Sequence, residues 1–157
     1  MFTLLLAAVM SGESEFRFFR CDACSATMYQ LNDFFTEKMK RRKKPLGAVD
    51  LALISDQICT TKTFDKRKYG VKEVGNDAYL FGPGVPTHVP KDVGFGQMGM
   101  GDYDHRLASF CRVFVDHFGE DELYNLFNEG KLQAESVCKD ECLTDSSGSV
   151  GISYREL

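Results

Sequence analysis

The sequence predicts an all-α helical fold that is stapled by disulfide bonds and carries one small β-hairpin. Three observations lead to this prediction. Apolar residues recur at helical spacing through most of the chain, six cysteines form a CxxC pair, two single residues and a CxxxC pair, and a turn signal separates two short β-like runs near the middle. An even number of cysteines in a small exported chain usually forms disulfides rather than a metal or catalytic site.

The composition indicates what class of protein this is and which partners it does not favour. The chain has 157 residues, of which 43% are hydrophobic and 27% are charged, as is typical of one folded domain. Its formal net charge of −4 gives no overall attraction to nucleic acid or to anionic membranes. No apolar run is long enough to span a bilayer. We therefore expect neither a nucleic-acid partner nor stable membrane insertion.

The first residues resemble the apolar part of a signal peptide. Met1–Met10 is almost entirely apolar, and cleavage after Ser11 would place Val9 and Ser11 at the two positions where small side chains are required. The alternative is a buried N-terminal strand or helix. We expect a signal peptide at residues 1–11 and a single domain at residues 12–157.

The first helix is predicted at Cys21–Lys44, because apolar residues there follow the spacing i, i+4, i+7 and i+11. Pro45 and Gly47 then end it. The residues of the apolar face are Cys24, Met28, Leu31 and Phe35.

The end of this helix, Lys38–Lys44, is strongly basic and resembles a nuclear-import or nucleic-acid-binding patch. A chain that enters the secretory pathway never meets the import machinery. We therefore interpret the run as a solvated last turn, where cations suit the negative end of the helix dipole. An acidic protein partner is the remaining functional alternative.

The middle of the chain changes character. A second helix is expected at about Val49–Thr60. Tyr69–Val74 and Ala78–Phe81 flank the turn Gly75–Asp77, which predicts a β-hairpin. Gly94–Gly101 is rich in glycine but lacks the Lys-Ser/Thr ending of a phosphate-binding loop, so we interpret it as a flexible surface loop.

Three helices are predicted in the C-terminal half: one after Asp104 with a wide aromatic stripe, one at Glu120–Phe127, and one from about Lys131. We interpret the stripe as core rather than as a lipid- or client-binding face. The polar tail, about residues 143–157, is expected to be mobile. The stripe consists of Leu107, Phe110, Cys111, Phe114, Val115 and Phe118.

Helical spacing makes the cysteine pattern interpretable. The first cysteine pair is spaced i, i+3 and the last i, i+4, so each pair occupies one helix face. If the first and last helices are antiparallel, a nested pairing aligns, whereas parallel helices would suit a crossed pairing. The nested set is Cys21–Cys142, Cys24–Cys138 and Cys59–Cys111.

Other chemistries compete with structural disulfides. Cys21-Asp-Ala-Cys24 has the spacing of a thioredoxin-type redox motif, but no alternating β/α pattern surrounds it. The two cysteine pairs would also suffice for a zinc site, which would leave Cys59 and Cys111 as a separate pair. The three histidines come with no serine motif of the nucleophile-elbow kind. We therefore expect no catalytic residue, no metal ion and no cofactor.

The C-terminal residues indicate a compartment. Their last two positions match the Lys-Asp-Glu-Leu type of endoplasmic-reticulum retrieval signal. Together with the apolar N-terminus, this predicts a protein of the endoplasmic-reticulum lumen, with partial secretion as an alternative. The predicted signal consists of Tyr154, Arg155, Glu156 and Leu157.

The cysteine order, the helical pattern and this tail resemble the canopy family of saposin-like endoplasmic-reticulum proteins. The chain departs from the family pattern at the basic run 38–44, at the loop 94–101 and at Tyr154. The matching stretches are Cys21–Cys24 with Tyr29-Gln30, Tyr69–Val74, Gly82-Pro-Gly84, Phe118–Asp121 and Arg155–Leu157.

This resemblance implies a saposin-like helical leaflet and a non-enzymatic folding factor. Members of the family act as co-chaperones of the lumenal Hsp90 during the maturation of secreted or cell-surface clients, and a role in client disulfide formation has been proposed for them. We therefore expect a co-chaperone whose partners are the lumenal Hsp90 and secreted or membrane-protein clients. The alternatives are a thiol-disulfide oxidoreductase that uses Cys21 and Cys24, and a saposin-type lipid-binding protein.

Overall fold

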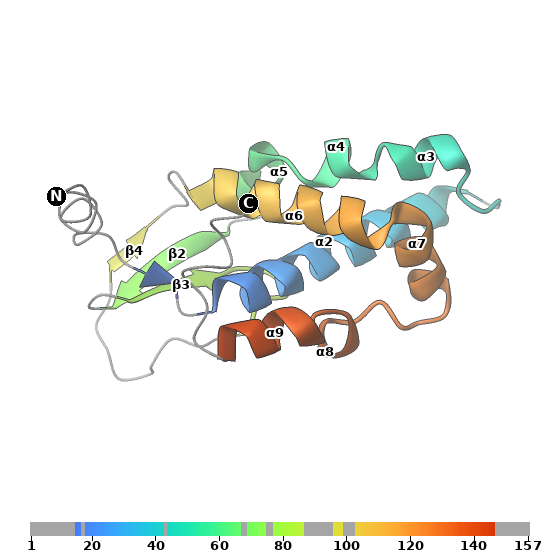
Figure 1. Cartoon of the computed structure of the whole chain (residues 1–157). Helices are drawn as coiled ribbons and strands as arrows, with labels where there is room; N and C mark the ends of the chain where they lie inside the picture. Colours follow the sequence, from blue (N-terminus) through green and yellow to red (C-terminus); the bar gives the residue numbers. More distant parts are fainter. Residues whose placement is uncertain are drawn as a thin grey trace, which may run out of the picture.

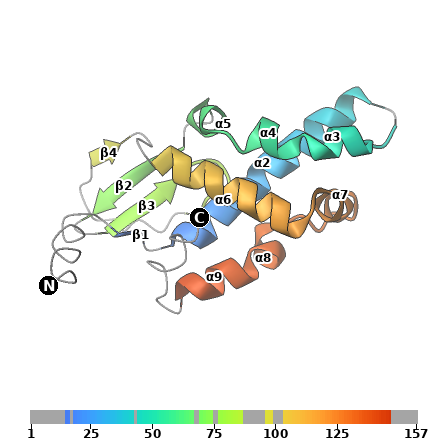
Figure 2. The ribbon, with the colours of Figure 1, turned by 45° about the horizontal axis from the view of Figure 1, so that its top comes forward.

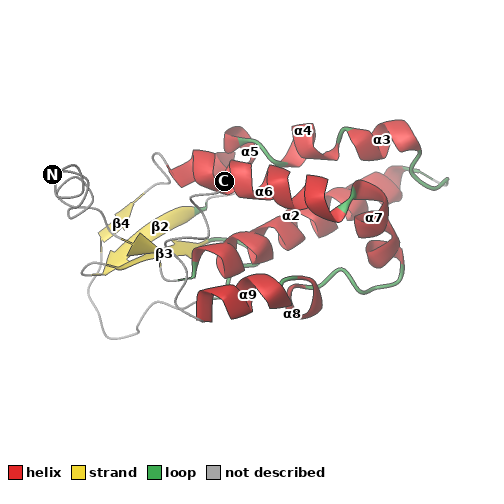
Figure 3. Ribbon diagram, in the orientation of Figure 1, coloured by secondary structure: helices red, strands yellow, loops and turns green. Residues whose placement is uncertain are grey.

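The structure is a computed structural model that describes residues 15–16, 18–42, 44–66, 69–74, 77–86, 96–98 and 103–146. Helices make up most of it, and a small sheet lies at one end (Figure 1, Figure 3). The predicted helical fold, stapled by disulfides and carrying a β-hairpin, is confirmed. The elements are β1 (Glu15–Phe16), α2 (Phe19–Arg41), α3 (Ala48–Ala52), α4 (Ile54–Ile58), α5 (Thr61–Lys66), β2 (Gly70–Val74), β3 (Asp77–Phe81), β4 (Gly96–Met98), α6 (Tyr103–Phe118), α7 (Glu120–Asn128), α8 (Ala134–Val137) and α9 (Lys139–Ser146).

Helix α2 is the central element of the fold. Helices α6 and α9 and strand β3 all pack against it, and Figure 2 shows it passing beneath α6. Every residue from Asp22 to Met28 is buried, because neighbouring elements cover this part of the helix on all sides. Farther along, Phe35 is fully buried. The centroid of its ring lies 5.4 Å from the ring centroid of Tyr124 and 5.1 Å from that of Phe127, both on α7. The helix ends at Arg41, three residues before the predicted end.

The segment predicted as one helix, Val49–Thr60, is instead a series of short helices, so this prediction was wrong. Leu53 lies between α3 and α4 with φ −92° and ψ 0°, outside the regular helical conformation. The Thr60 hydroxyl accepts a hydrogen bond from the Thr63 backbone N–H at 3.1 Å and so starts α5 as a new helix. Ile54 and Ile58 still face the core.

The sheet has four strands in the order β1-β3-β2-β4. The predicted hairpin forms its centre, with Gly70 opposite Phe81 and Val74 opposite Asp77. Strand β1 joins parallel to β3, and β4 joins antiparallel to β2. The interpretation of the glycine-rich segment as loop was therefore wrong for Gly96–Met98, because backbone hydrogen bonds to the free edge of β2 give these residues a partner that their composition does not reveal.

The C-terminal half follows the predicted order of helices. Gly119, with φ +97°, separates α6 from α7, a conformation that favours glycine. The helix predicted from Lys131 begins later, at Ala134, and is divided at Cys138 into α8 and α9. Helix α9 continues to Ser146, so residues 143–146, at the start of the expected mobile tail, are helical.

Candidate functional site

Two nested disulfides join α2 to the C-terminal helices. Cys21 is bonded to Cys142, with a Cα–Cα distance of 4.3 Å, and Cys24 is bonded to Cys138, with 5.8 Å. The arrangement is the nested one expected for antiparallel helices. The inner pair is fully buried, whereas the outer pair is partly exposed. The neighbouring side chains of Arg20 and Glu141 form an ion pair beside the outer disulfide.

The third disulfide, Cys59–Cys111, joins the end of α4 to α6 across a Cα–Cα distance of 5.2 Å. It is buried at both ends. At the next residue of α6, Arg112 Nη1 lies 3.0 Å from Asp56 Oδ1, in an exposed ion pair that adds little to stability. The disulfides thus fix both α4 and the C-terminal helices to the centre of the fold.

This pairing decides what the cysteines can do. All six are bonded in these three disulfides, and none is free. Cys21 and Cys24 are therefore not a dithiol or disulfide with each other, as a thioredoxin-type site requires. The four sulfur atoms of the two pairs are bonded to each other and present no thiolates for zinc. Within the described chain, no group of three or more His, Cys, Asp or Glu residues is placed to hold a metal ion.

Three of the short motifs that carry the family resemblance meet around the side chain of Tyr69. Gln30 on α2 donates a hydrogen bond from Nε2 to Tyr69 Oη at 3.1 Å, and Tyr69 donates to the carbonyl oxygen of Pro83 at 2.6 Å. Gly82 has φ +150°, and a Cβ there would lie 2.2 Å from the Tyr69 ring. This contact joins the central helix to the hairpin and the following loop. Packing and hydrogen bonding therefore explain these three motifs.

The aromatic stripe of α6 is only partly used by the core. Three rings form what we call the phenylalanine ladder: Phe110, Phe114 and Phe118, with successive ring centroids 5.9 and 5.6 Å apart and nearly parallel planes. Phe110 is 2% exposed and also packs at right angles on Phe19, but the other two rings of the ladder are only partly buried. The interpretation of the whole stripe as core was therefore too simple.

Grooves lie on both sides of the ladder. One has a volume of about 260 Å³ and is lined by Phe110, Phe114 and the neighbouring Val113, which is 49% exposed. The other, of about 390 Å³, has Phe118, Leu126 and Val137 as its apolar lining, and polar residues from α7 to α8 complete it. The ladder thus presents apolar walls to solvent, close to α9, α8 and α7. Such a surface accepts apolar side chains of a partner.

The other residues considered in the sequence analysis are two histidines on α6 and the two ends of the chain. His105, on α6, is exposed and lies 3.8 Å from Asp104 at the start of the same helix, and His117 is exposed near its end. The predicted signal peptide and the predicted retrieval residues Tyr154–Leu157 lie outside the described residues. No helix in the described part of the chain has the length and apolar character needed to cross a membrane.

Comparison with known proteins shows which proteins this chain is similar to. No family model matches the chain. Curated proteins named "Marginal zone B- and B1-cell-specific protein" are similar to it: that of Bos taurus is 30% identical over 125 residues, that of Homo sapiens 28% over 126, and that of Rattus norvegicus 28% over 122. The chain is therefore similar in sequence to canopy-family proteins. The resemblance that the sequence predicts is confirmed.

The similarity covers most of this chain but less of its relatives. Each alignment spans 75% of the chain and 64% of the relative, so the chain spans a little under two thirds of the length of the curated proteins that it matches. The relatives' names carry no enzyme designation. Three disulfides are typical of proteins that pass through the secretory pathway.

Proposed function

We propose that this chain is a non-enzymatic folding factor of the endoplasmic-reticulum lumen, which assists the maturation of secreted or cell-surface proteins together with the lumenal Hsp90. The observation that carries the proposal is the phenylalanine ladder, a partly exposed apolar surface on a helix that disulfides hold in place. Homology to the canopy-family relatives and the secretory type of disulfide framework support the same function.

The ladder suits the binding of incompletely folded chains. Its rings lie on α6, which Cys59–Cys111 fixes to α4, while the nested disulfides fix α9 and the end of α8 on the other side of the grooves. A surface fixed in this way stays open and does not have to be ordered when a client binds, which lowers the entropic cost of binding. Exposed apolar segments of clients then replace water on Phe114 and Phe118.

The direct test measures binding to an unfolded client that has no thiols. A secreted protein that has been reduced and carboxymethylated offers apolar segments but no disulfide chemistry. We expect the oxidised chain to bind it, and Phe114→Ser to weaken binding by about tenfold, because loss of a buried aromatic contact is worth roughly 1.5 kcal/mol or more. Fluorescence anisotropy of the labelled client measures the affinity.

The matched control is Leu53→Ser, which removes another partly exposed apolar side chain, 43% exposed, outside the ladder. It should leave client affinity unchanged. Equal losses from both variants would show non-specific hydrophobic binding and contradict the proposal. Extraction of lipid from vesicles that depends on Phe114 would instead support a saposin-type lipid carrier.

The cellular part of the proposal is tested separately. After crosslinking in intact cells, the chain should co-purify with the lumenal Hsp90, and the protein should be protected from protease in sealed microsomes. Protease sensitivity in sealed microsomes would place the chain on the cytosolic side and contradict the lumenal role.

A further inference from the structure

The basic run Lys38–Lys44 is a sequence feature that has no role in the proposed function. It holds six of the chain's 19 Lys and Arg residues, although the net charge of the whole chain is −4. The run covers the end of α2 and the residues that follow it. The cations among its described residues are exposed or partly exposed, so this end of the molecule is locally positive against an acidic background.

Neighbouring carboxylates neutralise only part of this charge. Arg42 Nη1 lies 2.6 Å from Asp50 Oδ2, and Lys40 Nζ lies 3.4 Å from Glu37 Oε1. The other described cations of the run have no such partner. Considering only residues that the structure describes, no ion pair is made by Lys38, Arg41 and Lys44.

A groove beside the run combines these cations with an apolar lining. It has a volume of about 360 Å³ and lies between the second half of α2 and the helices α4 and α5. Its apolar lining includes Phe34 and Ile58, while Lys38 and Arg41 supply the cations. The Lys38 ammonium lies 5.5 Å from the centre of the Phe34 ring, so the charge is held directly over the apolar lining.

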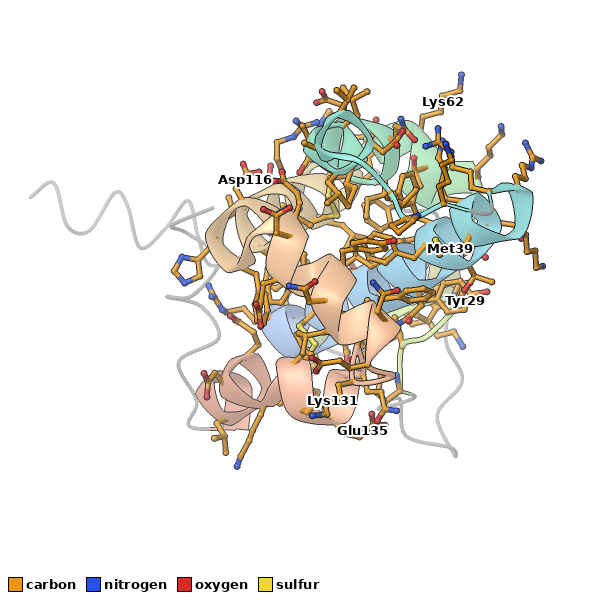
Figure 4. The ribbon with its side chains drawn as sticks, turned by 90° about the vertical axis from the view of Figure 1, so that its right-hand side faces the viewer. Tyr29, Met39, Lys62, Asp116, Lys131 and Glu135 are labelled. Atoms are coloured by element: carbon orange, nitrogen blue, oxygen red, sulfur yellow. A yellow bond between two sulfur atoms is a disulfide. The ribbon has the colours of Figure 1, made fainter. Side chains whose placement is uncertain are left out.

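Helix α5 extends the positive surface beyond the groove. Thr63 lines the groove, and the adjacent Lys62 is exposed, as is Lys66 in the last turn. Figure 4 shows the Lys62 side chain projecting away from the ribbon into solvent. The groove is therefore accompanied by cations from two separate elements.

We propose that this basic groove binds an acidic segment of a partner protein, in which Asp or Glu residues flank an apolar side chain. The apolar residue packs on Phe34 and Ile58, and the flanking carboxylates approach Lys38 and Arg41. The inference goes beyond the proposed function, because the basic groove shares no residue with the phenylalanine ladder or its grooves.

Charge and lining favour a protein segment over other anions. Asp33 and Glu37 also line the groove, and their carboxylates repel the closely spaced phosphates of a nucleic acid or an anionic membrane. A nucleic-acid backbone also has no aliphatic side chain to pack on Phe34, whereas an acidic peptide can place its charges selectively beside the cations.

The test uses the full oxidised chain and a fluorescent peptide in which a leucine is flanked by glutamates. We expect saturable binding that weakens as salt rises, because exposed charges are screened beyond a Debye length of about 8 Å at physiological ionic strength. The variant Lys38→Glu/Arg41→Glu should lose about tenfold or more in affinity, since two favourable exposed pairs become repulsive. A peptide with serine in place of leucine should bind more weakly than the leucine peptide.

The control is Lys131→Glu/Lys139→Glu, which reverses two exposed cations outside the groove and should leave peptide affinity unchanged. Because reversal near the end of α2 also disturbs the helix dipole, the milder Lys38→Gln/Arg41→Gln provides a second variant, with circular dichroism to confirm folding. Equal losses in the groove and control variants, or tighter binding of an oligonucleotide or of phosphatidylserine vesicles than of the peptide, would overturn the proposal. Phe114→Ser should keep peptide binding, which separates this surface from the ladder.

Discussion

Removal of the inner disulfide, by Cys24→Ala/Cys138→Ala, should cost much less than the length of its loop suggests. The two cysteines are 114 residues apart, and closing a loop of that size alone is worth about 4–5 kcal/mol in the chain-entropy model. While Cys21–Cys142 remains, however, it already joins the two ends of that loop. The loop that Cys24–Cys138 then closes contains only the short segments Cys21–Cys24 and Cys138–Cys142, whose cysteines are three and four positions apart. Closing so short a loop is worth about 2–3 kcal/mol.

The nested geometry therefore predicts a specific pattern of free energies of unfolding. Each single removal should lose about 2–3 kcal/mol, while removal of both disulfides should lose about 7 kcal/mol, which is more than the sum of the two. A loss of that size is comparable with the whole stability of a typical domain, so the double variant should be largely unfolded. The matched comparison is Cys21→Ala/Cys142→Ala, which opens the outer disulfide.

Urea denaturation followed by far-ultraviolet circular dichroism measures these differences, since the chain has no tryptophan. The inner variant should be slightly the less stable of the two, because Cys24 and Cys138 are fully buried and their loss leaves a small cavity. A loss of about 5 kcal/mol from either single removal, with simple additivity in the double variant, would refute the nested pairing as the source of stability.

Three further substitutions test local features by the same denaturation assay. Tyr69→Phe should cost about 1–3 kcal/mol, because the buried Gln30 amide loses its acceptor and the Pro83 carbonyl its donor; no change in stability would show that water replaces the hydroxyl. Gly82→Ala should cost about 1–3 kcal/mol or more, because the new methyl group overlaps the Tyr69 ring at a strained φ; a neutral result would mean that the ring moves freely. Thr60→Ala should cost about 1 kcal/mol by removing the cap of α5, and Thr60→Ser should restore it.

The parts of the fold that could be predicted depend on local or covalent signals. Helices α2, α6 and α7 have regular apolar spacing, and the hairpin has a turn signal between two β-like runs, so nearby residues specify each of them. Which cysteines share a helix face could be predicted, and the nested pairing then depended on the expectation that the first and last helices are antiparallel. Packing in the structure agrees with that local reasoning because α2 and α9 do lie against each other.

The parts that could not be predicted depend on contacts between distant segments. Strand β4 forms at Gly96–Met98 because an edge of β2 is available, and nothing in its own composition indicates that partner. The break at Leu53 and the division at Cys138 follow from how short helices fit against the core. The contact between Gln30 and Tyr69 joins residues 39 positions apart. The basic run was visible in the sequence, but the groove beside it was not.

In the proposed function, the chain binds its clients without exchanging disulfides with them. The most direct measurement is acid quenching during the refolding of a reduced secreted protein in the presence of the oxidised chain, followed by thiol alkylation and mass spectrometry. We expect Cys21 and Cys24 to remain bonded to Cys142 and Cys138, and no mixed disulfide with the client to form. A covalent complex through Cys21 or Cys24, or alkylation of these residues as client disulfides appear, would contradict it.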